Sequence, residues 1–208
     1  MSILAITDLA PSRGLTTLAD VKQELGITGG TDDAFLLDLI AQTSTAIEGW
    51  CNRAFARETL TETFRLSCSV SVLHLTRWPV IAITSVVEDG TVLGSIDTEL
   101  DPSSGELWRL NGADDRSLWP PAKIVIAYEA GYRLPGTPDR DLPADLERAC
   151  IEAIKARWFA RLRDPLVKGE EVPGVAVADY WVPADGSGDP GLPPIVIGML
   201  WRWRLPTI

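Results

Sequence analysis

Residues 31–51 read TDDAFLLDLIAQTSTAIEGWC, and the spacing of their apolar side chains decides how this part of the chain folds. The side chains of the predicted stripe recur mainly at steps of three and four, at Leu36, Leu39, Ile40, Thr43, Ile47, Trp50 and Cys51. Such spacing places them on one side of a helix, so the stretch predicts a long amphipathic helix with one buried face. Thr31 is expected to cap its start, and the two aspartates that follow complement the positive end of the helix dipole.

A shorter helix is predicted just before this one. Thr17, with Asp20 three residues later, resembles a capping box, and Gly26 is placed to end the helix. The two helices predict a helical hairpin over residues 15–56. Residues 1–14 show no periodicity and are expected to form an extended N-terminal arm.

From residue 57 onward the apolar pattern changes to a period of two, which is typical of strands. This pattern predicts an antiparallel β subdomain over residues 57–133, with five to seven short strands. Asp89-Gly90 is the strongest hairpin signal, because both central positions of the favoured two-residue turn need positive φ.

A third helix is predicted to open at Pro143, where the missing N–H costs nothing. Residues 134–165 would complete the helical core, and residues 166–208 would form a Gly- and Pro-rich loop and a C-terminal tail. The expected fold class is therefore α+β. A helical hairpin and a long third helix pack together, with an inserted small antiparallel β unit and an extended C-terminal tail.

The composition argues against several classes of protein. The 208 residues are 46% apolar and 23% charged, which is ordinary for a folded domain and unlike a disordered chain. No apolar run reaches the roughly 18 residues of a membrane helix, and the first residues make a poor secretory signal. The net charge of −10 argues against a protein that grips phosphates, since that task needs clustered Lys and Arg.

Catalytic and metal-binding patterns are missing from the sequence. The three cysteines lie far apart, which favours reduced thiols, and the single histidine, His74, falls in a predicted strand. No zinc-binding or nucleophile motif accompanies them, and the acidic pairs are sequence neighbours whose side chains point apart. We therefore expect no enzyme activity, no cofactor and no metal.

Eight tryptophans are the unusual feature of the composition. Trp181, Trp201 and Trp203 lie in the poorly periodic C-terminal part, where Trp201 and Trp203 alternate with Arg202 and Arg204. Tryptophan is enriched in interface hot spots, so these residues favour docking onto another protein. Two other readings stay open: the tail folds back over the helices of its own chain, or it binds a membrane or nucleic acid.

The segments together resemble the head–tail connector family of long-tailed bacteriophages and related gene transfer agents, also known as adaptor or head-completion proteins. The resemblance covers nearly the whole chain from residue 15. It rests on the order and spacing of short motifs at residues 18–27, 32–40, 47–53, 75–80, 83–86, 127–132, 142–146, 168–172 and 192–196. The loop at residues 177–191 and the Trp-Arg-Trp-Arg run depart from the family pattern.

The resemblance implies a structural role in a virion, at the head–tail interface, for a protein made in the bacterial host cytoplasm. Such proteins form a dodecameric ring beneath the portal, continue the DNA channel without binding DNA specifically, and present a surface to the tail or to a stopper protein. They do not bind membranes. The tail of the chain would dock on the portal, and its candidate contact residues are Trp181, Leu192, Ile195, Val196, Trp201, Arg202, Trp203 and Arg204.

Two other classes of protein stay open at this point. One is a β-rich, tail-associated attachment module that binds carbohydrate or protein through exposed tryptophans. The other is a small enzyme, which would need a pocket with convergent ionisable groups.

Overall fold

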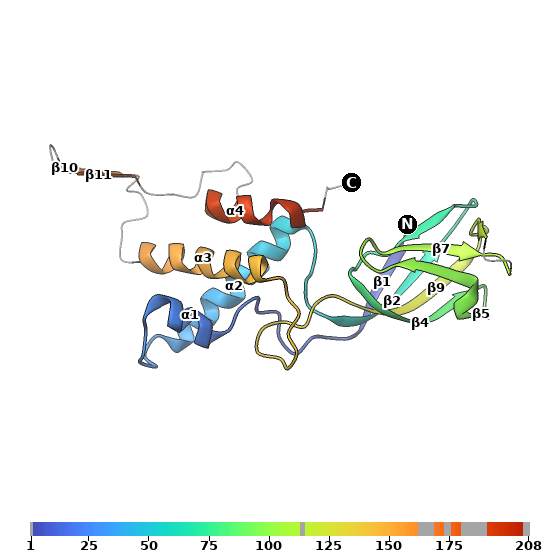
Figure 1. The fold of residues 1–208 in the computed structure, drawn as a ribbon, viewed down its shortest axis with the longest axis horizontal. Coiled ribbons are helices and arrows are strands. Elements are labelled where there is room, and N and C mark those ends of the chain that lie inside the picture. Colours follow the sequence, from blue (N-terminus) through green and yellow to red (C-terminus); the bar gives the residue numbers. More distant parts are fainter. Residues whose placement is uncertain (1, 113–114, 162–168, 173–175, 180–190, 206–208) are drawn as a thin grey trace. The chain divides into compact units, whose positions relative to one another are not determined.

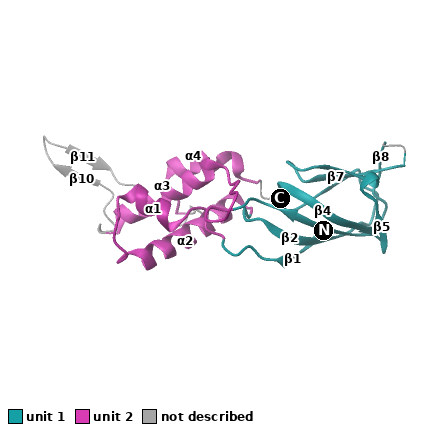
Figure 2. Cartoon of the chain, turned by 60° about the horizontal axis from the view of Figure 1, so that its bottom comes forward, with its two compact units in different colours: residues 1–12, 54–133 teal, residues 13–53, 134–208 magenta. Residues whose placement is uncertain are grey.

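The computed structural model describes residues 2–112, 115–161, 169–172, 176–179 and 191–205. The chain divides into two compact units (Figure 2). Unit 1 comprises residues 1–12 and 54–133, and unit 2 comprises residues 13–53 and 134–208. Unit 1 contains the strands of the two larger sheets, and unit 2 contains the helices (Figure 2).

The expected fold class is wrong, because the chain is β-rich. Among the described residues, strands β1 to β9 form two antiparallel sheets, and the four α-helices contain 8, 19, 17 and 7 residues. The β part is thus not a small insert in a helical hairpin with a long third helix, and the tail is not simply extended. Short turns in the sequence limit the length of each strand, but the pairing of distant strands decides how large the sheets become.

The first sheet of unit 1 has the strand order β1-β2-β9-β4-β5. Its members are β1 (Ser2–Asp8), β2 (Glu58–Arg65), β9 (Lys123–Ala130), β4 (Val80–Glu88) and β5 (Thr91–Leu93). Residues expected as an N-terminal arm thus supply an edge strand, in which Leu4 lies opposite Glu62.

The second sheet has the order β3-β7-β6, with β8 also paired to β7. Its members are β3 (Val72–His74), β7 (Glu106–Leu110), β6 (Thr98–Asp101) and β8 (Arg116–Ser117), and the 3-10 turn η1 (Ser95–Asp97) precedes β6.

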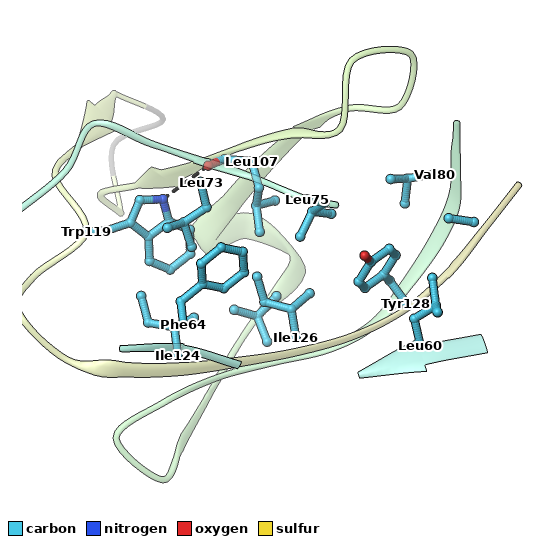
Figure 3. Packing of buried hydrophobic residues seen from close by; sticks show 12 residues of the cluster. Leu60, Phe64, Leu73, Leu75, Val80, Leu107, Trp119, Ile124, Ile126 and Tyr128 are labelled. Carbon is cyan, nitrogen blue, oxygen red and sulfur yellow. Dashed lines mark hydrogen bonds between the residues drawn. The ribbon is translucent and has the colours of Figure 1, made fainter. Parts of the chain in front are cut away.

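Side chains from both sheets share one core (Figure 3). The alternation predicted for β2 holds, since Leu60, Glu62 and Phe64 are all buried. Trp119 is fully buried, and its indole Nε1 donates a hydrogen bond to the Leu107 carbonyl at 3.1 Å. This bond satisfies the polar end of the largest side chain in the core.

Two turns of unit 1 depend on positive φ. The β4–β5 hairpin has φ of 45° at Asp89 and 89° at Gly90, as its sequence predicts. Gly131 follows β9 with φ of 105°, and a Cβ there would lie 2.4 Å from the Ala56 carbonyl oxygen. A side chain at residue 131 would therefore force the two backbone segments apart.

Unit 2 contains α1 (Leu18–Leu25), α2 (Asp33–Cys51) and α3 (Ala144–Ala160). The Thr17 hydroxyl accepts a hydrogen bond from the Asp20 N–H at 3.2 Å, as the predicted cap requires. Helix α2 begins one residue later than expected, with Asp32 rather than Thr31 as its N-cap.

Buried side chains of α2 and α3 face one another within the unit. The Ser44 hydroxyl lies 3.8 Å from the Cys150 sulfur, and it accepts a hydrogen bond from the Leu15 N–H at 3.0 Å. The remaining elements of the unit are the antiparallel pair β10 (Gly169–Val172) and β11 (Ala176–Asp179), helix α4 (Pro194–Leu200) and the 3-10 turn η2 (Trp201–Trp203).

Candidate docking site at the C-terminal helix

Helix α4 starts at a pair of prolines that suit the first turn of a helix. Pro193 is the N-cap and Pro194 occupies the first helical position, where its fixed φ is favourable. Leu192, just before the prolines, and Val196 and Leu200 within the helix are spaced at steps of four and are at most 1% exposed. All three are buried within unit 2, in which α4 packs beside α3 (Figure 1).

Polar contacts hold the segment on either side of α4. The Trp203 indole Nε1 donates to the Asp145 Oδ2 at 2.9 Å, and the Arg202 Nη2 lies 2.7 Å from the same oxygen. Downstream, the Leu205 N–H donates to the Cys51 carbonyl at 2.9 Å. Asp145 thus binds two consecutive side chains of the Trp-Arg-Trp-Arg run.

Aromatic and cationic side chains of the Trp-Arg-Trp-Arg run contact those at the end of α2. The ring centroids of Trp50 and Trp201 are 6.3 Å apart, with an interplanar angle of 52°. The Arg204 guanidinium lies 5.0 Å from the centre of the Trp50 ring, and that of Arg53 lies 6.0 Å from the Trp203 ring. Contacts of this kind hold the cationic groups near the ring faces and so help to orient the rings.

The structure divides the predicted contact residues into two groups. Leu192 and Val196 are buried within unit 2, and Trp203 is half-buried. Ile195 and Trp201 are 64% and 67% exposed, and Arg202 and Arg204 are exposed as well. Trp181 lies outside the described residues.

The segment therefore folds back on the helices of its own chain and still presents a surface to solvent. Ile195 and Trp201 are its apolar members, and Arg202 and Arg204 are its charged members. From residue 191 to residue 208 the sequence contains these two arginines and no acidic residue. We call Ile195, Trp201, Arg202 and Arg204 the α4–η2 surface.

Sequence reasoning missed the residues that position this surface. The helical spacing predicts Trp50 in the buried stripe of its helix, yet it is half-buried and its ring is tilted against that of Trp201. The role of Asp145 could not be predicted from the sequence, because an acidic residue in the first turn of a helix is ordinarily explained by the helix dipole.

The described residues offer no catalytic or metal centre. They contain no group of three or more His, Cys, Asp or Glu side chains that could hold a metal ion. His74 lies in β3, but its side chain is 66% exposed rather than half-buried, and its Nδ1 is 3.8 Å from Glu106.

The three cysteines are free thiols. Burial raises the pKa of the Cys51 and Cys150 thiols to about 12, which makes both poor nucleophiles. Cys68 is exposed.

The β unit also lacks the exposed tryptophans that an attachment module would use. Trp119 is buried, Trp78 and Trp108 are half-buried, and the Arg116 guanidinium sits 3.9 Å from the centre of the Trp108 ring. In the described part of the chain, no helix is both long enough and apolar enough to cross a membrane.

Comparison with known proteins places the chain in a family. The family pattern of head completion proteins matches residues 14–159, and no curated protein is similar enough to be matched. Among solved structures, the chain is similar to a neck protein of a native gene transfer agent (GTA) particle computed with C12 symmetry. The TM-score is 0.60 at 18% identity, over 99% of this chain and 97% of that one.

A second similar structure is the neck of an empty GTA particle computed with C6 symmetry, with a TM-score of 0.59 at 19% identity. It also covers 99% of this chain and 97% of its own. A chain in the virion of the native gene transfer agent has a TM-score of 0.57 at 18% identity, with the same coverage. These likenesses extend the shared fold over both units and past the end of the family pattern.

The match over residues 14–159 confirms the resemblance seen in the sequence. The chain belongs to the head completion protein family, and its role is that of a non-enzymatic connector between the head and the tail of a phage or phage-like particle.

Proposed function

We propose that twelve copies of this chain form a closed ring beneath the portal of a tailed phage or gene transfer agent. The ring extends the DNA channel from the head and offers its far side to the tail or to a stopper protein. The chain is made in the host cytoplasm and works in the virion. Its fold, shared along almost its full length with a neck chain of a C12-symmetric particle, supports this arrangement. The C6 symmetry of the empty particle's neck is compatible with twelve copies as well.

The charge of the chain suits a channel through which DNA slides. Unit 1 contains 12 acidic and 7 basic residues, and unit 2 contains 17 acidic and 12 basic residues. A ring of twelve chains at −10 each has a formal charge of about −120, which repels the phosphate backbone instead of binding it. Either unit could line the channel without holding the DNA.

The portal contact is assigned to the α4–η2 surface. The observation that supports it is the exposure of Trp201, at 67%, on a segment that is otherwise anchored by buried side chains and by Asp145. A large aromatic side chain held in place by its neighbours contributes binding area at little entropic cost. Arg204 beside it can form a bidentate contact with a carboxylate of the portal, whereas Arg202 is already paired with Asp145.

Point substitutions test the portal contact better than deletion of the tail. Deleting residues 172–208 would also remove Leu192, Val196 and Leu200 and so expose the core of unit 2. Trp201→Ala leaves those side chains in place. Truncating an interface anchor costs about 2 kcal/mol or more. We therefore expect binding to the purified portal of the same particle to weaken by about 30-fold or more.

The matched control is Phe159→Ala on α3, because Phe159 is also 67% exposed and lies outside the α4–η2 surface. Its affinity for the portal should equal that of the unmodified chain. Circular dichroism and a thermal melt verify that both variants fold. If Trp201→Ala and Phe159→Ala bind the portal equally well, the α4–η2 surface is not the portal contact.

A further inference from the structure

The five-stranded sheet of unit 1 ends in an edge strand on each side. β1 and β5 occupy the two ends of the order β1-β2-β9-β4-β5, and within the described residues each pairs with another strand on one side only. The outward N–H and C=O groups of such a strand are available to another extended segment. The backbone therefore selects a strand as the partner of each edge.

Neither edge carries the features that usually keep edge strands apart. Residues 2–7 of β1 include no charged residue and no proline, and the one irregularity in the pairing of β1 lies between Ile6 and Asp8. Thr91–Leu93 of β5 is uncharged as well. Ile3 and Val92 are 59% and 69% exposed. Lysines, prolines and bulges normally guard an exposed apolar edge, so these two edges are suited to pairing with another chain.

Two rows of side chains cross this sheet from one edge to the other. The members of the row on one face are Ile3, Thr63, Val125, Val87 and Val92. The members of the row on the other face are Leu4, Glu62, Ile126, Val86 and Leu93. Each row thus begins with an apolar side chain in β1 and ends with another in β5.

Placing β5 of one copy beside β1 of another continues both rows. Val92 then lies beside Ile3 on one face, and Leu93 lies beside Leu4 on the face where both already pack against the core of unit 1. Apolar pairs on neighbouring strands stabilise a sheet. Because the two ends of each row are at the same level of the sheet, the repeat adds no step along the strands. A closed ring of heterologous contacts needs such a repeat.

We propose that each subunit adds the β1 edge of its unit 1 to the β5 edge of the next copy in the ring. The two edges run in parallel, because all neighbouring strands of this sheet are antiparallel and β1 and β5 are the first and the fifth. β5 has only three residues, so the contact is small and forms in the ring, where each copy has two neighbours, rather than between two free copies. This inference rests on the proposed ring and names one contact within it.

Disulfide formation in assembled particles tests the pairing directly. The variant carries Ile3→Cys and Val92→Cys in a Cys68→Ser background, which removes the exposed native thiol. Neighbouring strands lie about 4.8 Å apart, which is within the Cα separation that a disulfide spans. Within one chain β1 and β5 are four strand spacings apart, roughly 19 Å, so this disulfide can form only between copies. Particles of the phage or gene transfer agent that encodes the chain, assembled with this variant and mildly oxidised, should give a ladder of covalent oligomers on a non-reducing gel.

Controls separate this pairing from general proximity. Ile3→Cys alone and Val92→Cys alone should give no ladder. Ile3→Cys combined with Ile81→Cys, whose native side chain is 45% exposed on β4, should give none either. A disulfide-linked dimer of Ile3→Cys alone would mean that β1 pairs with β1, and it would overturn the inference. Particles that contain the chain in a symmetric ring but show no ladder with the first pair would also overturn it and leave the ring intact. Tailed particles that assemble without the chain would overturn the proposed function itself.

A charge exchange at the same contact gives an independent readout. Ile3→Lys places an unpaired charge on the β1 edge, and we expect at least a tenfold drop in the number of copies incorporated per particle. Adding Val92→Glu to this variant places the opposite charge beside the lysine and should restore incorporation. Ile81→Lys makes the same change outside the contact and should be incorporated normally. Circular dichroism verifies that the variants fold. Equal incorporation of Ile3→Lys and Ile81→Lys would count against the β1 edge as a ring contact.

Discussion

The docking of α4 on the helical unit gives a sharp quantitative prediction. Leu200 is fully buried at the end of α4, whereas Ile195 on the same helix is 64% exposed. Replacing a buried leucine with alanine costs about 2–5 kcal/mol, because the apolar contacts are lost and a cavity remains. Replacing an exposed isoleucine changes stability by about 0.5 kcal/mol or less. Leu200→Ala and Ile195→Ala are therefore a matched pair on one seven-residue helix.

The loss should appear first as local opening of the C-terminal segment. This segment is held by Leu192, Val196 and Leu200 together with the contacts of Asp145, so it can open without unfolding the sheets of unit 1. Each 1.4 kcal/mol changes an equilibrium constant tenfold. A cost of 2–5 kcal/mol would thus raise the opening equilibrium by about 30-fold to several thousand-fold.

Hydrogen exchange followed by mass spectrometry measures this opening on peptides that cover residues 191–205. In Leu200→Ala these peptides should lose most of their protection, while peptides from β2 and β9 keep theirs. In Ile195→Ala all peptides should exchange as in the unmodified chain. Equal protection of residues 191–205 in the two variants would refute the reasoning that α4 is anchored through its buried face.

Three further predictions concern other parts of the chain. The Tyr128 hydroxyl donates to the buried Glu62 carboxylate at 2.9 Å, so Tyr128→Phe should lower the free energy of unfolding in urea by about 1.5–3 kcal/mol. Hydrogen bonds from Lys155 and Arg148 lower the pKa of Glu24 from 4.5 to about 2. This ion-paired group stabilises the fold above pH 4.5 and loses its effect as the pH falls toward 2, so thermal melts of Glu24→Gln should depend less on pH in that range. Under native conditions at pH 8, only Cys68 should react rapidly with a disulfide reagent, since the other two thiols are buried.

Each of these predictions can be contradicted by a simple result. A Tyr128→Phe variant as stable as the unmodified chain would mean that the Glu62 contact contributes nothing to stability. If the melting temperature depends on pH in the same way with and without the Glu24 carboxylate, the Glu24 ion pairs do not contribute to the loss of stability at low pH. Rapid reaction of all three thiols in the folded chain would mean that the two buried cysteines are accessible.

Local patterns were enough to predict several elements. The steps of three and four in residues 31–51 correspond to α2, and Asp89-Gly90 forms the turn between β4 and β5. These features depend only on residues near one another in the sequence, through their spacing and their conformational preferences. The order of short motifs also identified the family, which the match to residues 14–159 confirms.

Local patterns could not predict which strands pair when they lie far apart in the sequence. Residues 2–8 lack a clear alternation, and only their pairing with β2, more than 50 residues away, makes them a strand. The same limitation made the expected fold class wrong, since the partition of the strands into two sheets depends on which distant segments meet. The alternation in β2 placed Glu62 on the side of Leu60, but not in a site where Tyr128 and Thr76 bind its carboxylate.

At the candidate site, too, the sequence predicted some features and the tertiary structure decided others. From the sequence alone, the Trp-Arg-Trp-Arg run and the apolar residues before it predict a docking segment, because their composition is typical of interfaces. Only the tertiary structure decided which of them stay available. Packing against α3 buries Leu192 and Val196, and Asp145 orients Trp203 and Arg202. Ile195 and Trp201 stay largely exposed, although the Trp201 ring lies beside Trp50 of α2, because the buried positions of the segment are set by contacts between residues far apart in the chain.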